Sequence, residues 1–229
     1  MQAGNLTQVF GQAIMVLVPM ILSLTVHEFA HAWAARRLGD LTAEARGRLT
    51  LNPLAHADPV GTVGLPLLIL IANAGMGGGG IPFFGWAKPV PTNPANYTRK
   101  VTLRTGLMLV AVAGPVSNLV MSLLAAGLYS VAVHAGFADL VPEPLEMFLV
   151  YMIQINIALF VFNMIPIYPL DGQKVLSGLL PPRSAIKYDR FNVQFGWMAL
   201  MAIIFMGRDI IGVPVRLVFH GVLSVVGLG

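Results

Sequence analysis

The feature that most limits what this chain can fold into is a set of long apolar runs with almost no charge. The runs are Phe10–Ala35, Leu107–Val133, Leu145–Met164, Phe191–Met206 and Ile210–Leu228. A helix needs about 20 apolar residues to cross the hydrocarbon of a bilayer. Hydrophobic residues make up 56% of the 229 residues and charged residues only 10%, too few to cover a soluble protein of this size. The sequence therefore predicts a polytopic membrane protein.

Two further segments differ from these runs. Val60–Ala74 is about 15 residues long and contains glycine and proline, which favours a re-entrant segment over a clean span. The segment Phe83–Pro91 contains prolines that forbid a helix or a central strand, so we expect a short edge segment. The predicted fold is therefore all-α and polytopic, with about five transmembrane helices, one re-entrant segment and a short β-like edge segment.

The basic residues predict the orientation. Arg36 and Arg37 close the first run, and the positive-inside rule places them in the cytoplasm and the N-terminus outside. If Val60–Ala74 does not cross, twelve of the fourteen Lys and Arg residues lie on the cytoplasmic side. If it does cross, they divide between the two sides, so charge bias favours the re-entrant interpretation. We expect a multi-pass protein of the cytoplasmic (inner) membrane.

Composition also excludes several classes of protein. The chain has no cysteine, which excludes disulfides, thiolate metal sites and a cysteine nucleophile. Its net charge of +4 is consistent with an excess of Lys and Arg residues on the cytoplasmic side of a membrane protein. We therefore expect no nucleic-acid partner.

The first apolar run contains the sequence His27-Glu28-Phe29-Ala30-His31. Residues four apart lie on one face of a helix, so both imidazoles can bind one metal ion. Glu28 lies about 100° around the helix, within reach of a metal-bound water but not itself a ligand. The alternative is two histidines buried for packing. It is disfavoured because ionisable residues inside a membrane span are expensive and by default functional.

A catalytic zinc site usually has three protein ligands, and here the third must be His, Asp or Glu. His27 lies near the cytoplasmic end of its span, and Leu145–Met164 delivers Asp171 to the same depth. Prolines break the chain just before Asp171, and irregular backbone at membrane depth is tolerated only inside protein or beside a wet cavity. Asp171 is therefore the expected third ligand, although Asp171-Gly172 also suits a surface turn. The candidates at other depths or in the C-terminal part are Glu143, Glu146, His134 and His220.

Four motifs together resemble the site-2 protease family of intramembrane zinc metalloproteases. They are His27-Glu28-Phe29-Ala30-His31, Gly114-Pro115-Val116-Ser117-Asn118, Asn163 with Pro166, and Pro169-Leu170-Asp171-Gly172. The segments Gly47–Pro53, with His56, and Phe84–Pro91 resemble a compact bacterial branch without PDZ or CBS domains. The resemblance implies one intramembrane protease domain over residues 1–229, with a catalytic core at about 8–180 and C-terminal helices at about 191–228.

The resemblance also implies roles for individual residues. His27, His31 and Asp171 would ligate Zn²⁺, Glu28 would be the catalytic carboxylate, and Asn163 would steady the oxyanion. Asn163 also suits a cap on the broken helix or a bridge between two spans. The expected activity is zinc metalloendopeptidase cleavage of transmembrane protein substrates, as in regulated intramembrane proteolysis, with the site toward the cytoplasmic side of the lipid bilayer.

Four residues carry weaker predictions as substrate contacts. Asn118 suits a hydrogen bond between helices or a substrate contact. His56 is as consistent with an ordinary surface histidine as with a gate or substrate contact. Gly85 and Trp86 belong to the edge segment Gly85–Val90, which could hold an unwound substrate as an added strand. Trp86 also suits an anchor at the membrane interface.

Two functions of other classes remain as alternatives. A metal transporter should place ionisable residues at several depths and usually has repeated halves, and we find neither in the sequence. A zinc-bound protein that binds membrane partners without cutting cannot be separated from a slow protease, although an intact Glu28 argues against it. A protease class with a Glu ligand would need Glu143 or Glu146, which lie at the wrong depth.

Overall fold

The computed structural model describes residues 3–75, 85–98, 100–206 and 208–229, and the regular elements within these ranges are all helical. The helices are α1 (Ala3–Arg37), α2 (Thr42–Ala45), α3 (Pro53–His56), α4 (Leu65–Gly75), α5 (Leu103–His134), α6 (Glu143–Asn163), α7 (Asp171–Leu179), α8 (Pro182–Met206) and α9 (Arg208–Val225). A π-helical turn, Pro59–Gly64, leads directly into α4, and Pro94–Asn96 and Ala138–Leu140 are 3₁₀ turns. The predicted all-α class is confirmed.

Three of the described helices are long and apolar enough to cross a membrane: Ala13–Arg37 within α1, α5 and α6. They match three of the predicted runs and confirm a multi-pass membrane protein. The C-terminal runs form α8 and α9, which are bent by 72° against each other and would make a fourth span if counted together. The prediction of about five transmembrane helices is therefore not confirmed. The first half of α8 is too charged to lie in hydrocarbon, so less of it is available to span than its length suggests.

The segment predicted to be re-entrant forms the π-helical turn and α4. Their joint apolar stretch, Pro59–Asn73, is shorter than a regular span. Asp58 caps its start, where Oδ1 accepts hydrogen bonds from the backbone N–H groups of Val60 and Gly61 at 3.0 and 2.7 Å. The short length agrees with a segment that does not cross as a regular span. Whether it re-enters the bilayer stays a prediction.

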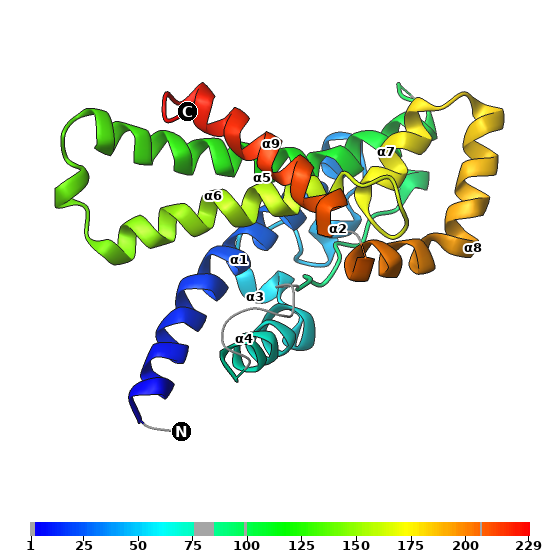
Figure 1. Ribbon diagram of the computed structural model, residues 1–229. Helices are drawn as coiled ribbons and strands as arrows, with labels where there is room; N and C mark the ends of the chain where they lie inside the picture. The colour runs from blue at the N-terminus through cyan, green and yellow to red at the C-terminus, as the bar shows by residue number, and fades with distance from the viewer. Residues whose placement is uncertain (1–2, 76–84, 99, 207) are drawn as a thin grey trace.

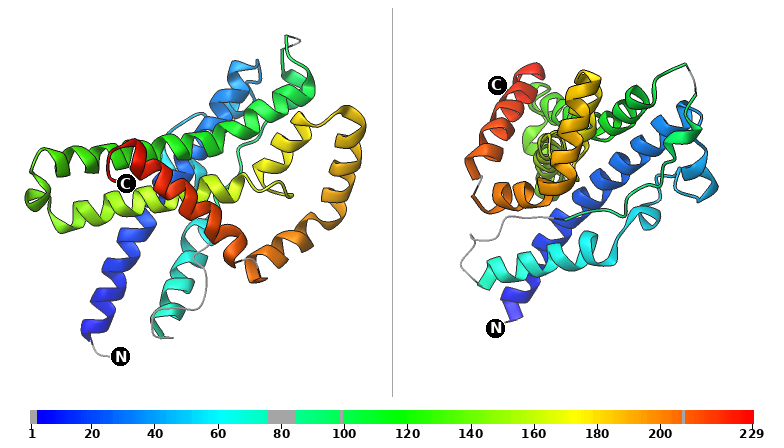
Figure 2. Two further views of the ribbon diagram at one scale, coloured as in Figure 1. Left: turned by 45° about the horizontal axis from the view of Figure 1, so that its top comes forward. Right: turned by 90° about the vertical axis from the view of Figure 1, so that its right-hand side faces the viewer.

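Helices α5 and α6 form a long antiparallel hairpin that is the centre of the molecule (Figure 1). α1 crosses this hairpin and packs on both of its helices, while α9 runs obliquely across it and packs mainly on α6 (Figure 2). Small residues such as Ala126, which is fully buried, let the helices approach closely, and Ile157 fills the space between them. The short helix α7 packs on α5 and returns the chain to α1.

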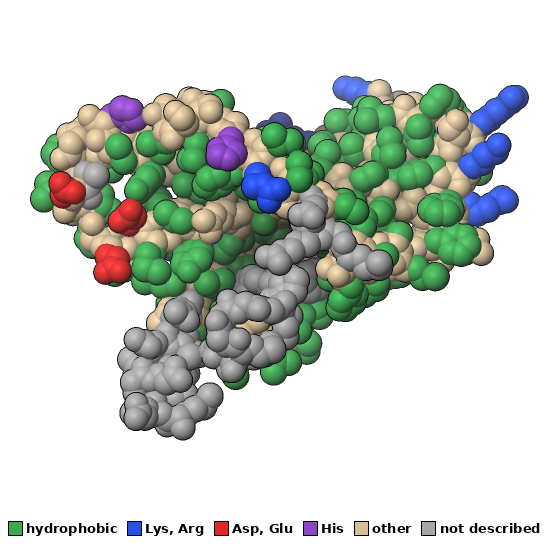
Figure 3. All heavy atoms as spheres, in the orientation of Figure 1, with side chains coloured by type: hydrophobic (Ala, Val, Ile, Leu, Met, Phe, Trp, Pro, Cys, Tyr) green, Lys and Arg blue, Asp and Glu red, His purple; other side chains and the backbone are tan. Residues whose placement is uncertain are grey.

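Charged side chains separate to the two ends of the hairpin (Figure 3). The acidic groups on the visible face gather where α5 turns into α6, at the end that includes Glu143. Most of the visible Lys and Arg side chains lie at the opposite end, where α8 begins with Arg183 and Lys187. On this face the acidic and the basic side chains therefore lie toward opposite ends of the hairpin.

The predicted β-like edge is not confirmed, because no strand is assigned within the described residues. Residues 85–93 are irregular backbone instead, with single hydrogen bonds in place of a ladder. The N–H of Trp86 donates to the carbonyl of Gly61 at 3.1 Å, and that of Lys88 donates to the carbonyl of His56 at 2.9 Å. Phe83 and Phe84 lie outside the described residues.

Candidate metal centre

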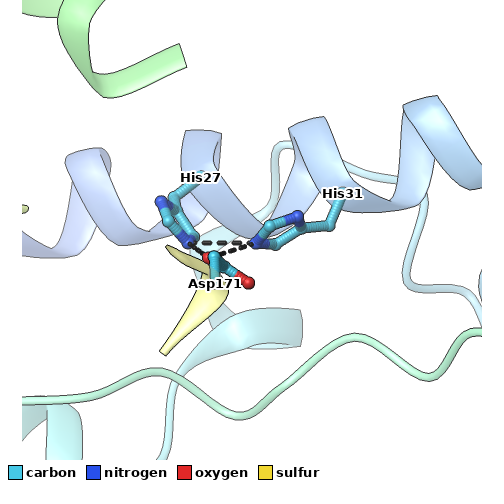
Figure 4. A group of neighbouring side chains, drawn as sticks. All are labelled: His27, His31 and Asp171. Atoms are coloured by element: carbon cyan, nitrogen blue, oxygen red, sulfur yellow. Dashed lines mark hydrogen bonds and ion pairs between the residues drawn. The ribbon is translucent and has the colours of Figure 1, made fainter. Parts of the chain in front are cut away.

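Three side chains from two distant segments converge on one point (Figure 4). The Nε2 atoms of His27 and His31 on α1 are 3.0 Å apart. Oδ2 of Asp171, the first residue of α7, lies 3.3 Å from Nε2 of His27 and 3.2 Å from Nε2 of His31. Two ligands of a tetrahedral zinc ion, each about 2.0–2.1 Å from the metal, are themselves about 3.3 Å apart. The spacing and the chemistry of the donor atoms therefore fit a zinc ion.

Helix α5 brings its backbone unusually close to the two histidines. Its residue at the contact is Gly114, where an added Cβ would lie 2.7 Å from Cε1 of His27 and nearer still to the ring of His31. One helical turn before and one turn after Gly114, α5 supplies a hydrogen-bond partner for each histidine. The carbonyl of Val110 lies 2.7 Å from Nδ1 of His31, and Oδ1 of Asn118 lies 2.6 Å from Nδ1 of His27. Positions 110, 114 and 118 share one helix face because they are four residues apart.

A tight loop after α6 places Asp171. The chain leaves α6 at Asn163 and turns back so closely that a Cβ at Gly172 would lie 2.5 Å from the carbonyl oxygen of Ile165. Only glycine fits against backbone at that distance. The carboxylate of Asp171 is consequently directed into the molecule, where its side chain is 12% exposed. The Asp-Gly pair thus serves the site as well as the turn.

Glu28 is held in place by the segment Gly85–Val90. Its Oε2 accepts a hydrogen bond from the backbone N–H of Val90 at 2.7 Å. Arg48 secures the same segment, since its Nη2 donates to the carbonyl of Lys88 at 2.6 Å. Arg48 is buried, although sequence analysis assigned it no role. Its position in the Gly47–Pro53 motif was the available signal.

The remaining predicted site residues have different environments. Nδ2 of Asn163 donates to the carbonyl of Leu159, one turn back on its own helix, at 3.0 Å. Its part in the site stays a prediction. His56 is not a surface histidine: it is 1% exposed, at the end of α3, with Nε2 2.8 Å from the carbonyl of Thr50. The polar residues around His56 left a surface histidine as one of two equal interpretations, but the chain folds over this side chain.

The edge residues Gly85 and Trp86 pack on the π-helical turn Pro59–Gly64 that leads into α4. A Cβ at Gly85 would lie 2.8 Å from the carbonyl oxygen of Gly61 and 3.2 Å from Sδ of Met20. The ring of Trp86 covers Gly61 so closely that a Cβ there would overlap it. These contacts fix the segment against the protein.

Sequence analysis missed two buried polar residues beside the site, Ser23 and Asn156. Both are fully buried, and Nδ2 of Asn156 donates to Oγ of Ser23 at 2.8 Å. The available signal was a polar side chain in the middle of an apolar run, because such groups need partners inside the membrane.

Comparison with known proteins places the chain in a family. The family profile named "Peptidase family M50" matches residues 128–207. A protein of Bacillus subtilis (strain 168) named "Putative zinc metalloprotease YwhC" is 39% identical over 170 residues, which cover 73% of this chain and 69% of that protein. The chain belongs to peptidase family M50. The predicted membership of the site-2 proteases is thereby confirmed, as is the prediction of a zinc metalloprotease.

Other relatives of this M50 protease are longer. "Putative zinc metalloprotease Rip2" of Mycolicibacterium smegmatis (strain ATCC 700084 / mc(2)155) is 34% identical over 174 residues, covering 76% of this chain and 60% of Rip2. The protein of the same name from Mycobacterium tuberculosis (strain ATCC 25618 / H37Rv) is 32% identical over the same shares. No solved structure matches this M50 chain.

Proposed function

We propose that this chain is an intramembrane metalloendopeptidase that hydrolyses peptide bonds within or next to transmembrane segments of membrane proteins. The observation that carries the proposal is that Asp171 converges with His27 and His31, and that these two histidines lie on a helix long and apolar enough to span a bilayer. A hydrolytic site within a membrane-spanning helix suits substrates whose cleaved segment also lies in the membrane. Regulated intramembrane proteolysis is the process in which such an enzyme would act.

In this proposal His27, His31 and Asp171 hold the zinc ion. Zinc supplies a Lewis acid that activates water and polarises a peptide carbonyl. Glu28 takes a proton from the attacking water and returns it to the leaving amine. The hydrogen bond from Val90 keeps the Glu28 carboxylate in one orientation during this exchange.

Asn163 is the proposed additional donor to the carbonyl oxygen under attack. Its amide nitrogen is engaged with the carbonyl of Leu159. The role therefore requires that the amide exchange this bond for one to the substrate.

The segment Gly85–Val90 is the proposed place for the unwound substrate. In extended backbone, alternate residues direct their N–H and C=O groups to opposite edges. The N–H groups of Trp86 and Lys88 are used on the protein side, so a substrate would have to pair with the residues between them. One of these, Ala87, is buried and must first become accessible. An extended substrate would pair there as an added strand.

Charge supports a site toward the cytoplasm. Arg36 and Arg37 end α1 about 8–9 Å along the helix from His31, at 1.5 Å per residue. The basic end of the hairpin continues with α8 (Figure 3). By the positive-inside rule this end faces the cytoplasm, so we infer an inner-membrane protease with its metal site near the cytoplasmic surface.

The decisive experiment combines metal analysis with cleavage of a model transmembrane peptide in detergent or liposomes. Glu28→Gln should keep zinc at the wild-type content and lose cleavage, because an amide accepts no proton. Glu44→Gln is the matched control, since Glu44 pairs with Arg36 at the surface, 2.7 Å away. Full cleavage by purified Glu28→Gln would end the proposal.

The strongest competing function is metal transport through the same ligands. Transport needs ionisable groups at successive depths. In the described part of the chain, His27, His31 and Asp171 are the one cluster of His, Asp and Glu suited to a metal. Zinc flux into liposomes without peptide cleavage would favour transport.

A further inference from the structure

A buried polar network surrounds His27 and has no part in the chemistry described so far. It joins three helices through Ser23 on α1, Asn118 on α5 and Asn156 on α6. Each of these three side chains has a relative exposure of 0%. Buried polar groups need hydrogen-bond partners, so the direction of each bond in the network can be worked out.

The amide of Asn118 can face only one way. Its Nδ2 lies 3.3 Å from the backbone carbonyl oxygen of Ser23 and 2.9 Å from Oδ1 of Asn156. A backbone carbonyl only accepts hydrogen bonds, so the nitrogen must face Ser23. The oxygen of the same amide, Oδ1, therefore faces Nδ1 of His27 at 2.6 Å.

The amide of Asn156 is fixed by the same argument. Its Nδ2 lies 2.8 Å from the carbonyl oxygen of Met152 and 2.8 Å from Oγ of Ser23. Its Oδ1 is thus the atom that accepts from Asn118. Oγ of Ser23 in turn donates to the carbonyl of Pro19 at 2.7 Å. The backbone carbonyls of Ser23, Met152 and Pro19 therefore determine which group donates and which accepts in every bond of the network.

The last bond in this chain determines where His27 carries its proton. Because Oδ1 of Asn118 is an acceptor, Nδ1 of His27 must be the N–H donor, and in the neutral imidazole its Nε2 then keeps a lone pair. His31 reaches the same state through the backbone, since its Nδ1 lies 2.7 Å from the carbonyl of Val110. Both lone pairs then point toward the carboxylate of Asp171, which is the arrangement a cation requires.

We propose that Asn118, oriented by Ser23 and Asn156, is a positioning residue that fixes His27 as the Nδ1–H tautomer and so makes its Nε2 a metal ligand. The inference rests on the proposed metal site. Partners that hold the second nitrogen of a ligand histidine typically change metal affinity by 10–100-fold when they are removed. The network also joins metal binding to the packing of α1, α5 and α6.

Three variants separate this role from simple packing. Asn118→Leu keeps the branched shape and the number of heavy atoms of the side chain but has no acceptor for His27. Asn118→Asp keeps an oxygen that can accept from Nδ1 of His27. Ser122→Ala is the control, because Ser122 is fully buried one turn along α5 and its hydroxyl donates to Leu119 on its own helix at 2.8 Å.

Two measurements on the full chain test the proposal. Chelator competition gives the zinc dissociation constant, and ¹⁵N NMR of labelled histidine in the metal-free protein reports the tautomer of His27. We expect Asn118→Leu to bind zinc about 10–100-fold more weakly and to lose the pure Nδ1–H form. Asn118→Asp should recover the affinity to within a few-fold, and Ser122→Ala should match the wild type.

Several results would overturn the proposal. They are wild-type affinity and tautomer in Asn118→Leu, or Asn118→Asp as weak as Asn118→Leu. If Asn118→Leu does not fold, the metal-free wild type decides, since an Nε2–H tautomer at His27 contradicts the network. A wild type that binds no zinc would defeat the proposed metal site instead, while its tautomer would still test the network.

Discussion

The backbone N–H of Val90 donates a hydrogen bond of 2.7 Å to Oε2 of Glu28, 62 residues away in the sequence. The proposed general base is therefore oriented by the same segment that we propose holds the substrate. Arg48 and the carbonyl of His56 hold this segment in place through Lys88. Any movement of the segment on substrate docking would reach Glu28 directly.

Val90→Pro tests this connection, because proline has no N–H to donate. We expect kcat to fall about tenfold, the equivalent of one hydrogen bond of about 1.4 kcal/mol. Zinc content should not change, because Glu28 is not one of the three ligands. Val90→Ala keeps the N–H and should retain most of the activity. Equal rates in the two variants would show that the hydrogen bond does not orient Glu28.

Asp171→Ala should lose both zinc and cleavage, because it removes the one anionic ligand of the proposed site. We expect the zinc dissociation constant to rise by more than about 100-fold, beyond the effect of losing an outer partner. Asp189→Ala is a matched control, since Asp189 accepts from Gln173 at 2.8 Å and does not belong to the metal group. Inductively coupled plasma analysis of both purified variants measures the difference. Stoichiometric zinc in Asp171→Ala would contradict the ligand assignment.

Gly114→Ala should separate α1 from α5, because the new Cβ would lie 2.7 Å from Cε1 of His27. We expect weaker zinc binding and a lower melting temperature. Gly127→Ala, on the same helix, has open space within 4 Å and should be neutral or slightly stabilising, since alanine favours a helix by up to about 1 kcal/mol over glycine. Thermal unfolding and chelator competition compare the two. Equal zinc binding by the two variants would show that the metal site does not need the close approach of α5 to α1 at Gly114.

Asp40 should make the protein less stable in acid. Burial raises the pKa of its carboxyl, but hydrogen bonds from Thr42, Asn96 and Asn93 outweigh it and hold the pKa below the usual 3.8. A lowered folded-state pKa stabilises the fold at pH values above 3.8, and this contribution disappears as the pH falls through the folded-state pKa.

The measurement is the melting temperature of wild type and Asp40→Asn as a function of pH. At pH 7 we expect the wild type to be more stable by about 1–3 kcal/mol, the range for hydrogen bonds to a charged group. The difference should shrink below pH 3.8. A difference independent of pH would show that the charge of Asp40 does not contribute.

The sequence anticipated the metal group for local reasons. Two histidines four residues apart on one helix must share a face, and the apolar run around them places that helix in the membrane. The depth of Asp171 followed from the direction of α6, which is also a property of chain order. The count of spans is not confirmed, because the charges and the bend in the C-terminal helices change how much of their apolar length can cross.

The sequence by itself determined the composition of the site: a membrane helix with two histidines, a glutamate beside them and an aspartate at matching depth. Only the tertiary structure decided how these groups are oriented. The hydrogen bond between His27 and Asn118 joins residues 91 positions apart, and the one between Val90 and Glu28 joins residues 62 positions apart. Helical periodicity acts over a few residues, whereas such bonds depend on how α1 and its neighbours pack, which no local pattern records.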